Sequence, residues 1–143
     1  MSIWAQPVKL EQLNAMSQGN MLGHLDITFT EVGDDYLCAE MPVTAKVKQP
    51  MGLLHGGASV VLAESLASCA AYLTVEQGGA VVGLEVNANH MKAVRDGVVT
   101  AKAKPLSMGR QVQVWQIDIF QQQQQVCAAR LTTMIKQPAV SAS

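Results

Sequence analysis

Charged side chains are scarce in this chain of 143 residues, of which only 15% are Asp, Glu, Lys or Arg. The formal net charge is −1, so no general excess of either sign favours binding to nucleic acid or to an anionic membrane. Apolar residues make up 49% of the chain, which allows a domain of this length to bury a core. We therefore expect one domain spanning residues 1–143, with no nucleic-acid or membrane partner.

Cysteine is also sparse, and its spacing indicates no disulfide framework or metal site. Cys38, Cys69 and Cys127 are odd in number and far apart, and they form neither a CxxC pair nor a Cys/His cluster with zinc-finger spacing. The first residues lack the basic-then-apolar pattern of a signal peptide, and no uncharged apolar run has the length of a membrane span. We expect free thiols and a cytoplasmic location.

The near-zero net charge hides an asymmetry along the chain. Residues 1–91 carry three basic side chains against nine acidic ones, whereas residues 92–143 carry seven basic side chains against two acidic ones. Scattered charge that keeps the protein soluble explains this as simply as a site for a phosphorylated ligand does, and both interpretations stay open at this point.

Alternating apolar residues and turn signals predict the order of the elements. A short helix is expected at 10–16, and a long helix is expected at 58–76, where neither proline nor glycine occurs. The expected strands lie at 25–30, 36–41, 82–89, 98–104, 110–120 and 126–136, with a polar hairpin at 121–125. The core spans about 23–136, and the tail from Gln137 is expected to fray. This order indicates an α+β fold with a largely antiparallel sheet.

The long helix is apolar almost all round, which predicts burial on most of its faces by a sheet that curls around it. Glu64 is its one charged residue before Glu76. Because burying a carboxylate costs several kcal/mol, Glu64 is either exposed or ion-paired at the helix edge, or it is kept for chemistry. Ser68 follows one turn later on the same face, as a small packing residue or as a partner of Glu64.

A glycine pair precedes this helix, directly after His55. Free N–H groups at a helix start stabilise developing negative charge, and glycine lets a ligand approach the backbone, so Gly56 is a candidate for an oxyanion site. His55 could equally be a capping residue. About two turns separate the helix start from Glu64, so a complete site could require a second chain.

These residues resemble a known family. The segment QPMGLLHGGASVVLAES at 49–65 resembles the signature of hotdog-fold thioesterases of the phenylacetate-degradation type, and the similarity continues through VVGLEVNANH, KPLSMGRQ, VWQIDIF and RLTTMI, roughly over 45–136. Within the family it looks closest to the branch that acts on 1,4-dihydroxy-2-naphthoyl-CoA in menaquinone synthesis and to the proofreading branch of enterobactin synthesis. The resemblance implies a curved, six-stranded antiparallel sheet around the helix, with dimers that form one continuous sheet and assemble into a homotetramer.

The resemblance also implies an activity, the hydrolysis of acyl- or aroyl-CoA, or of aroyl groups on a carrier protein. In such families the active site lies between subunits, with Glu64 from one chain and with Gln49, His55 and the Gly56 N–H from the other. Gly56 would polarise the thioester carbonyl, Glu64 would act as nucleophile or general base, and Ser68 would orient water or the carboxylate. Because the coenzyme A thiolate is a good leaving group, no metal or cofactor is expected.

Two further groups of residues follow from the resemblance by position. The acyl pocket is expected to include Val60, Cys69, Tyr72 and Val82. The coenzyme A contacts are expected at Gly83, His90, Met91, Lys92, Ala93, Leu106, Ser107, Met108, Gly109, Arg110, Gln111 and Lys136. Lys92 and Arg110 are the predicted phosphate contacts, which would give the basic C-terminal part a use.

Two other functions were weighed against hydrolysis. Hotdog dehydratases pair a histidine with a helix acid, but their histidine precedes a proline-rich run, whereas His55 leads directly into Gly56 and Gly57, with Glu64 nine residues later. A non-catalytic acyl-CoA-binding module would not need an isolated acid such as Glu64 in an apolar helix. Both alternatives are less favoured by the sequence than a thioesterase.

Overall fold

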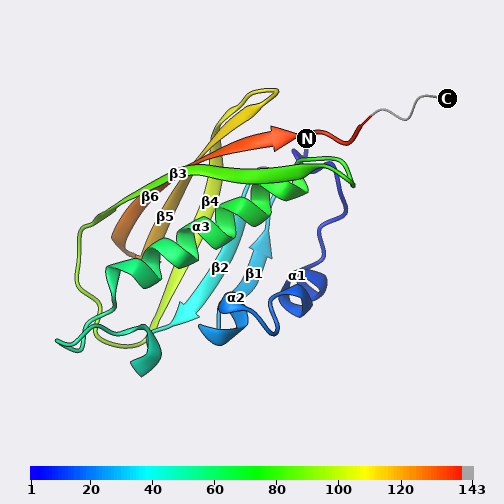
Figure 1. Ribbon diagram of the computed structural model, residues 1–143. Coiled ribbons are helices and arrows are strands. Elements are labelled where there is room, and N and C mark those ends of the chain that lie inside the picture. The colour runs from blue at the N-terminus through cyan, green and yellow to red at the C-terminus, as the bar shows by residue number, and fades with distance from the viewer. Residues whose placement is uncertain (140–143) are drawn as a thin grey trace.

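The computed structural model describes residues 1–139 of the chain. Its elements are α1 (Leu10–Met16), α2 (Met21–His24), β1 (Thr28–Val32), β2 (Leu37–Pro42), the short 3₁₀ helix η1 (Ala45–Val47), α3 (Gly56–Leu73), β3 (Ala80–His90), β4 (Val98–Met108), β5 (Val112–Gln121) and β6 (Gln124–Lys136). The strands form one antiparallel sheet in the order β1-β2-β4-β5-β6-β3, and α3 lies along one face of it (Figure 1). The predicted α+β architecture is confirmed.

The core lies between α3 and the concave face of the sheet. Leu62, Leu66 and Ala70 of α3 are fully buried, as are Trp115 and Leu131 of the strands beneath them. By length and composition alone α3 could cross a membrane, but half of its residues are buried inside the structure. Its alanines bring the strands close to the helix, because small side chains leave little to separate the two backbones.

One expectation about α3 was wrong, because the helix is not buried on most of its faces. A stripe along the side of α3 next to the edge strand β3 is only partly covered, and it contains Val60, Glu64, Ser68 and Tyr72. Their spacing of four residues places them on one face of the helix. The only charged residue of α3 therefore lies on its least buried face.

Local capping explains why the helix boundaries differ from the predicted ones. The helix α3 begins at Gly56, two residues before the predicted start, because the His55 side chain caps it by accepting a hydrogen bond from the Gly57 N–H. It ends at Leu73, three residues early, where Thr74 follows as the C-cap and donates its hydroxyl to the Ala71 carbonyl. The sequence analysis had offered His55 as a possible cap, and the structure confirms this, whereas the cap at Thr74 was not predicted.

The strand boundaries also differ in two places. The first strand begins at Thr28 instead of residue 25, because α2, which the sequence did not predict, occupies the segment before it and is capped by the Asn20 side chain. Strand β4 continues through Pro105 to Met108, and an irregularity of its pairing with β5 after Pro105 accommodates the missing N–H of the proline. The hairpin at Gln121–Gln125 is confirmed, and the tail predicted to fray lies partly outside the described residues.

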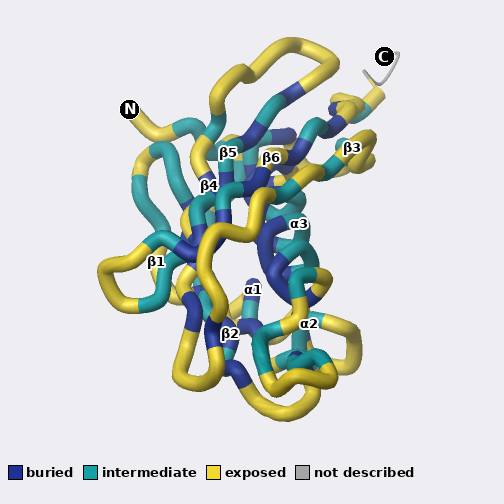
Figure 2. The backbone as a smooth tube through the Cα atoms, turned by 90° about the vertical axis from the view of Figure 1, so that its left-hand side faces the viewer, coloured by how far each residue is buried: buried dark blue, intermediate teal, exposed yellow. Residues whose placement is uncertain are grey.

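The two edges of the sheet are built differently. Strand β1 has five residues, and Asn14 of α1 hydrogen-bonds both the N–H and the carbonyl of Phe29 on it. Strand β3 has eleven residues, which are mostly exposed (Figure 2). An irregularity between Gly83 and Glu85 leaves Leu84 without a partner on β6.

Candidate active site

Glu64 lies over the edge strand β3. A Cβ atom added to Gly83 would stand 3.2 Å from Glu64 Oε2, so the absence of a side chain at this position leaves room for the carboxylate. The ion pairs found among residues 1–139 are Lys46–Asp26 and Lys104–Asp35, and neither includes Glu64. Within residues 1–139, Glu64 is therefore not an ion-paired glutamate at the helix edge, which was the alternative to a chemical role.

The start of α3 leaves one N–H group available. The Gly57 N–H donates to His55 Nδ1 over 2.8 Å, and the N–H groups of Ala58 and Ser59 donate to the His55 carbonyl. Among the described residues nothing accepts a hydrogen bond from the Gly56 N–H. Because His55 Nδ1 is an acceptor, the neutral ring carries its proton on Nε2, which makes that nitrogen a donor. His55 is thus a helix cap with a second nitrogen free to bind.

Gln49 lies in the loop before α3 and presents its amide in one orientation. Its side-chain oxygen accepts from the backbone N–H groups of Met51 and Leu53, which stabilises the turn between them. Two N–H donors require an oxygen there, so the amide nitrogen must lie on the other side. That nitrogen has no partner among residues 1–139 and can donate to a ligand.

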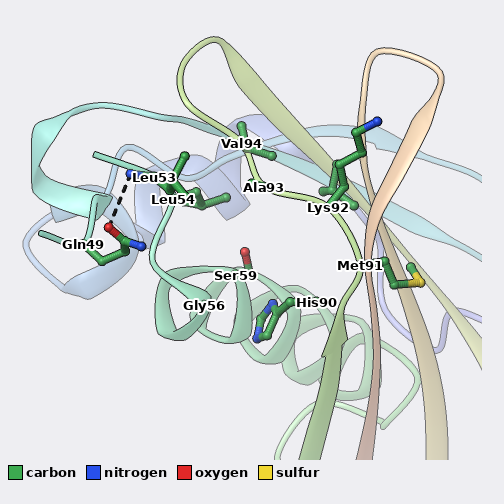
Figure 3. A pocket seen from close by; sticks show the side chains of 11 residues that line it. Gln49, Leu53, Leu54, Gly56, Ser59, His90, Met91, Lys92, Ala93 and Val94 are labelled. Atoms are coloured by element: carbon green, nitrogen blue, oxygen red, sulfur yellow. Dashed lines mark hydrogen bonds between the residues drawn. The ribbon is translucent and has the colours of Figure 1, made fainter. Parts of the chain in front are cut away.

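A cavity of about 370 Å³ adjoins the start of α3 (Figure 3). The His90 ring lies against the helix start, so that a Cβ atom on Gly56 would stand 2.8 Å from His90 Nε2. The absence of a side chain at Gly56 therefore leaves room for the His90 ring in this position. The cavity is lined by Gln49, Leu53, Leu54, Gly56, Ser59, His90, Met91, Lys92, Ala93, Val94 and Val126.

The structure brings only part of the predicted site together within one chain. Gln49 and Gly56 share the cavity with the segment His90 to Ala93 that was predicted to bind coenzyme A. Glu64 and Ser68 do not line this cavity, because they lie further along α3 on its partly exposed stripe. Within the described chain, the carboxylate and the free N–H are therefore separate.

The predicted coenzyme A residues fall into two groups at opposite ends of the sheet. The segment His90 to Ala93 begins with the last residue of β3 and lies beside Val126. The turn between β4 and β5, which contains Leu106 to Gln111, lies at the other end, next to Lys136, and the Gln111 carbonyl there accepts from the Ile135 N–H. One chain therefore does not bring Lys92 and Arg110 to the same phosphate.

The predicted acyl-pocket residues are likewise divided. Val60, Cys69 and Tyr72 lie on α3, but Val82 is 58% exposed and pairs with Met134, while its neighbour Gly83 faces the helix. Since neighbouring residues of a strand point to opposite faces, Val82 lies on the outer face of the sheet, away from the helix that carries the other three. Burial raises the pKa of the Cys69 thiol to about 12, so this thiol stays protonated at neutral pH and is no nucleophile.

The cavity also contains residues that the sequence analysis did not select. Ser59 is only 3% exposed and follows Gly56 by three residues, a spacing that places both on one side of the helix and that could have revealed it. Leu54, Val94 and Val126 come from three separate segments. No local pattern indicates that these segments meet.

Comparison with known proteins places this arrangement in a family. The Thioesterase superfamily matches residues 51–128. The chain is 56% identical over 134 residues to the 1,4-dihydroxy-2-naphthoyl-CoA hydrolase of Escherichia coli (strain K12), which covers 93% of this chain and 98% of the relative. The chain belongs to the thioesterase superfamily. Another superfamily relative, the proofreading thioesterase EntH of Cronobacter sakazakii, is 50% identical over 134 residues, with 93% of this chain and 98% of the relative covered.

A solved superfamily structure supports the fold. A thioesterase from Haemophilus influenzae matches with a TM-score of 0.93 at 42% identity, covering 99% of each chain. As a member of the thioesterase superfamily, the chain has the predicted hotdog fold and is a thioester hydrolase. These relatives do not support the alternatives of a dehydratase or of a non-catalytic binding module.

Proposed function

We propose that the chain hydrolyses aroyl-CoA thioesters to the free acid and coenzyme A, with 1,4-dihydroxy-2-naphthoyl-CoA of menaquinone synthesis as its substrate. Support comes from the Escherichia coli hydrolase of this thioester, which is 56% identical over nearly the whole chain. A second candidate substrate is an aroyl group carried on a carrier protein. It is favoured by the 50% identity to a proofreading thioesterase.

The observation that carries the catalytic proposal is the separation of Glu64 from the cavity at Gly56. Glu64 is the only acid on α3, and it lies beside the open edge strand β3. The Gly56 N–H is available for a carbonyl oxygen in a cavity that Glu64 does not line. A second subunit added along β3 would bring its own helix start to Glu64, so the active site is composed of both chains.

Each group in this site has a proposed role in the reaction. The Gly56 N–H at the positive end of α3 polarises the thioester carbonyl, and Glu64 of the other subunit attacks it as a nucleophile or activates a water as a general base. Gln49 and His55 donate to the carbonyl or to the water, and Ser68 orients the Glu64 carboxylate or the water. The electron pair of the broken C–S bond leaves on coenzyme A, whose thiol has a pKa of about 8.5 by analogy with cysteine.

The same pairing explains the two separate groups of coenzyme A residues. If β3 pairs with its copy in antiparallel fashion, the His90 end of one strand lies beside the Ala80 end of the other. The turn containing Arg110 would then come from the partner and approach Lys92. Both side chains are exposed and can bind phosphate from the two sides of the seam.

We further propose that two such dimers form a homotetramer. An exposed apolar row crosses three strands on the outer face of the sheet, formed by Val82, Met134 and Val112, which are 58%, 48% and 40% exposed and lie in register. Exposed apolar patches of this kind mark contact surfaces. The proposed location is the cytoplasm, in line with three free thiols, and no metal or cofactor takes part in the proposed mechanism.

The direct test measures thiol release by the wild type and by Glu64→Gln from 1,4-dihydroxy-2-naphthoyl-CoA, benzoyl-CoA, a fatty acyl-CoA and an aroyl thioester on a carrier protein. We expect the wild type to prefer 1,4-dihydroxy-2-naphthoyl-CoA. The variant should lose at least about a hundredfold in kcat, the scale of a lost acid–base or nucleophilic group. Equal turnover by the variant would remove Glu64 from the mechanism, and a preference for carrier-protein thioesters would favour the second substrate.

A mixing experiment tests whether the site is shared. Glu64→Gln and His55→Ala subunits should each be inactive alone, but after co-expression they should recover about a quarter of wild-type activity, because half of the dimers are mixed and each mixed dimer contains one intact site. Absence of recovery, with mixed dimers shown by mass spectrometry, would argue that each chain holds a complete site.

A further inference from the structure

The side chain of Ser59 is largely buried, but its hydroxyl opens onto the cavity at the start of α3. Ser59 is 3% exposed and has no side-chain hydrogen bond within residues 1–139, yet its oxygen is not fully enclosed, since the one fully enclosed side-chain atom without a partner in this part of the chain is Thr133 Oγ1. Helix serines commonly donate to a carbonyl one turn earlier, as Ser17 does to Leu13 over 2.9 Å. A hydroxyl that opens onto a cavity can instead bond to water or to a ligand held there. The Ser59 hydroxyl is therefore available to a ligand in the cavity.

The hydroxyl points into the cavity at the start of α3. Figure 3 shows the Ser59 oxygen directed away from the helix, into the space that also adjoins Gly56 and His90. A helical side chain leans toward the N-terminal turn before it, which is the turn that contains Gly56. The hydroxyl and the Gly56 N–H therefore face one cavity from adjacent positions on the same side of the helix.

The helix start supplies too few backbone donors for an oxyanion. His55 occupies the N–H groups of Gly57, Ala58 and Ser59 with its side chain and its carbonyl. The Gly56 N–H is the one that remains among the described residues. Sites that stabilise a tetrahedral intermediate combine backbone N–H groups with side-chain donors, including serine. A second donor beside Gly56 on the same side of the helix would therefore be a side chain.

We propose that the Ser59 hydroxyl is this second donor, and that it binds the thioester carbonyl oxygen together with the Gly56 N–H. The inference rests on the proposed thioester hydrolysis and adds a catalytic residue to it. When the Glu64 carboxylate, or a water that gives its proton to Glu64, attacks the carbonyl carbon, the C=O π electrons move onto the carbonyl oxygen, which both groups then stabilise. When the intermediate collapses, this electron pair re-forms the C=O bond, the C–S bond breaks, and its electrons leave on the coenzyme A sulfur.

The test compares Ser59→Ala with the wild type on whichever thioester the wild type turns over fastest, so it does not depend on the naphthoyl group being the substrate. We expect kcat to fall about a hundredfold, the low end for a lost oxyanion donor, with KM changed less than about twofold. Ser59→Thr keeps the hydroxyl and should retain kcat within about tenfold. An S-alkyl-CoA thioether, which has no carbonyl, should bind the wild type and Ser59→Ala with equal Kd.

Ser17→Ala is the matched control, because Ser17 is equally buried at 3% but its hydroxyl is already bonded to Leu13. It should leave kcat unchanged, while thermal unfolding checks that all variants fold. An unchanged kcat in Ser59→Ala would overturn the proposal. So would a raised KM together with weaker thioether binding at constant kcat, because Ser59 would then contact the coenzyme A arm. Loss of wild-type turnover on every thioester would instead contradict the proposed function.

Discussion

The two edge strands of the sheet, β1 and β3, differ in length, in exposure and in how their outer backbone groups are hydrogen-bonded. Strand β1 is short, and the Asn14 side chain occupies the backbone groups of Phe29 as a neighbouring strand would. Strand β3 is more than twice as long, and it exposes Val82 and Leu84 by 58% and 51%. Proteins normally shorten, cover or charge an open edge, because an exposed apolar edge recruits other chains.

The comparison indicates that β1 is a closed edge and β3 is an edge adapted for a partner. The same contrast holds for α3, whose sheet-facing side is fully buried while the stripe containing Glu64 near β3 is only partly covered. The proposed catalytic acid therefore lies beside the open edge. Assembly and catalysis should consequently respond together to changes at β3 and not to changes at β1.

The largest effect is expected from Leu84→Lys, at the unpaired position of β3. A lysine buried at a subunit seam without a partner costs about 3–5 kcal/mol, which weakens association by about two to four orders of magnitude. Light scattering should show smaller particles, and activity should fall in parallel. Thr30→Lys, at the corresponding irregularity of β1, is the control and should change neither. A fully active Leu84→Lys monomer would contradict the inference that β3 is the pairing edge and that activity depends on assembly.

A smaller effect is expected from Gly83→Ala. The new methyl group would stand 3.2 Å from Glu64 Oε2 and displace the carboxylate, so kcat should fall about ten- to hundredfold with the assembly intact. Alanine is easier to order in a strand than glycine, so the melting temperature should not fall. The reverse change at an exposed position of the same strand, Ala80→Gly, should leave kcat unchanged. Unaltered kcat in Gly83→Ala would mean that the position of Glu64 is not critical.

The smallest effect on activity is expected at the closed edge, from Asn14→Ala. This change leaves the N–H and the carbonyl of Phe29 unpaired and should lower the free energy of unfolding by about 1–3 kcal/mol in urea titrations. Turnover should stay within about twofold of the wild type, because β1 is remote from the proposed site. Gln18→Ala, which removes only an exposed 3.4 Å bond, should change stability by less than about 0.5 kcal/mol. A large loss of activity in Asn14→Ala would contradict the division between the edges.

Much of the fold could be predicted from local patterns. Alternation located the later strands, the polar run at Gln121 to Gln125 marked a hairpin, and the glycine pair after His55 marked the helix start to within two residues. Less of the candidate site could be predicted. The gap at Gly83 that receives Glu64 and the cavity role of Ser59 depend on which strand packs against which turn of α3, and residue spacing within one segment does not contain that information.

The amino-acid sequence by itself determined the type of each main element, the isolation of Glu64 among apolar residues and the family to which the chain belongs, because these depend on neighbouring side chains and on motifs. The tertiary structure alone decided that Glu64 lies beside an open edge, apart from the cavity at Gly56, and that Lys92 and Arg110 lie at opposite ends of the sheet. Strands of about ten residues at about 3.3 Å per residue separate their two ends by roughly 30 Å. Only the pairing of distant segments determines which ends meet.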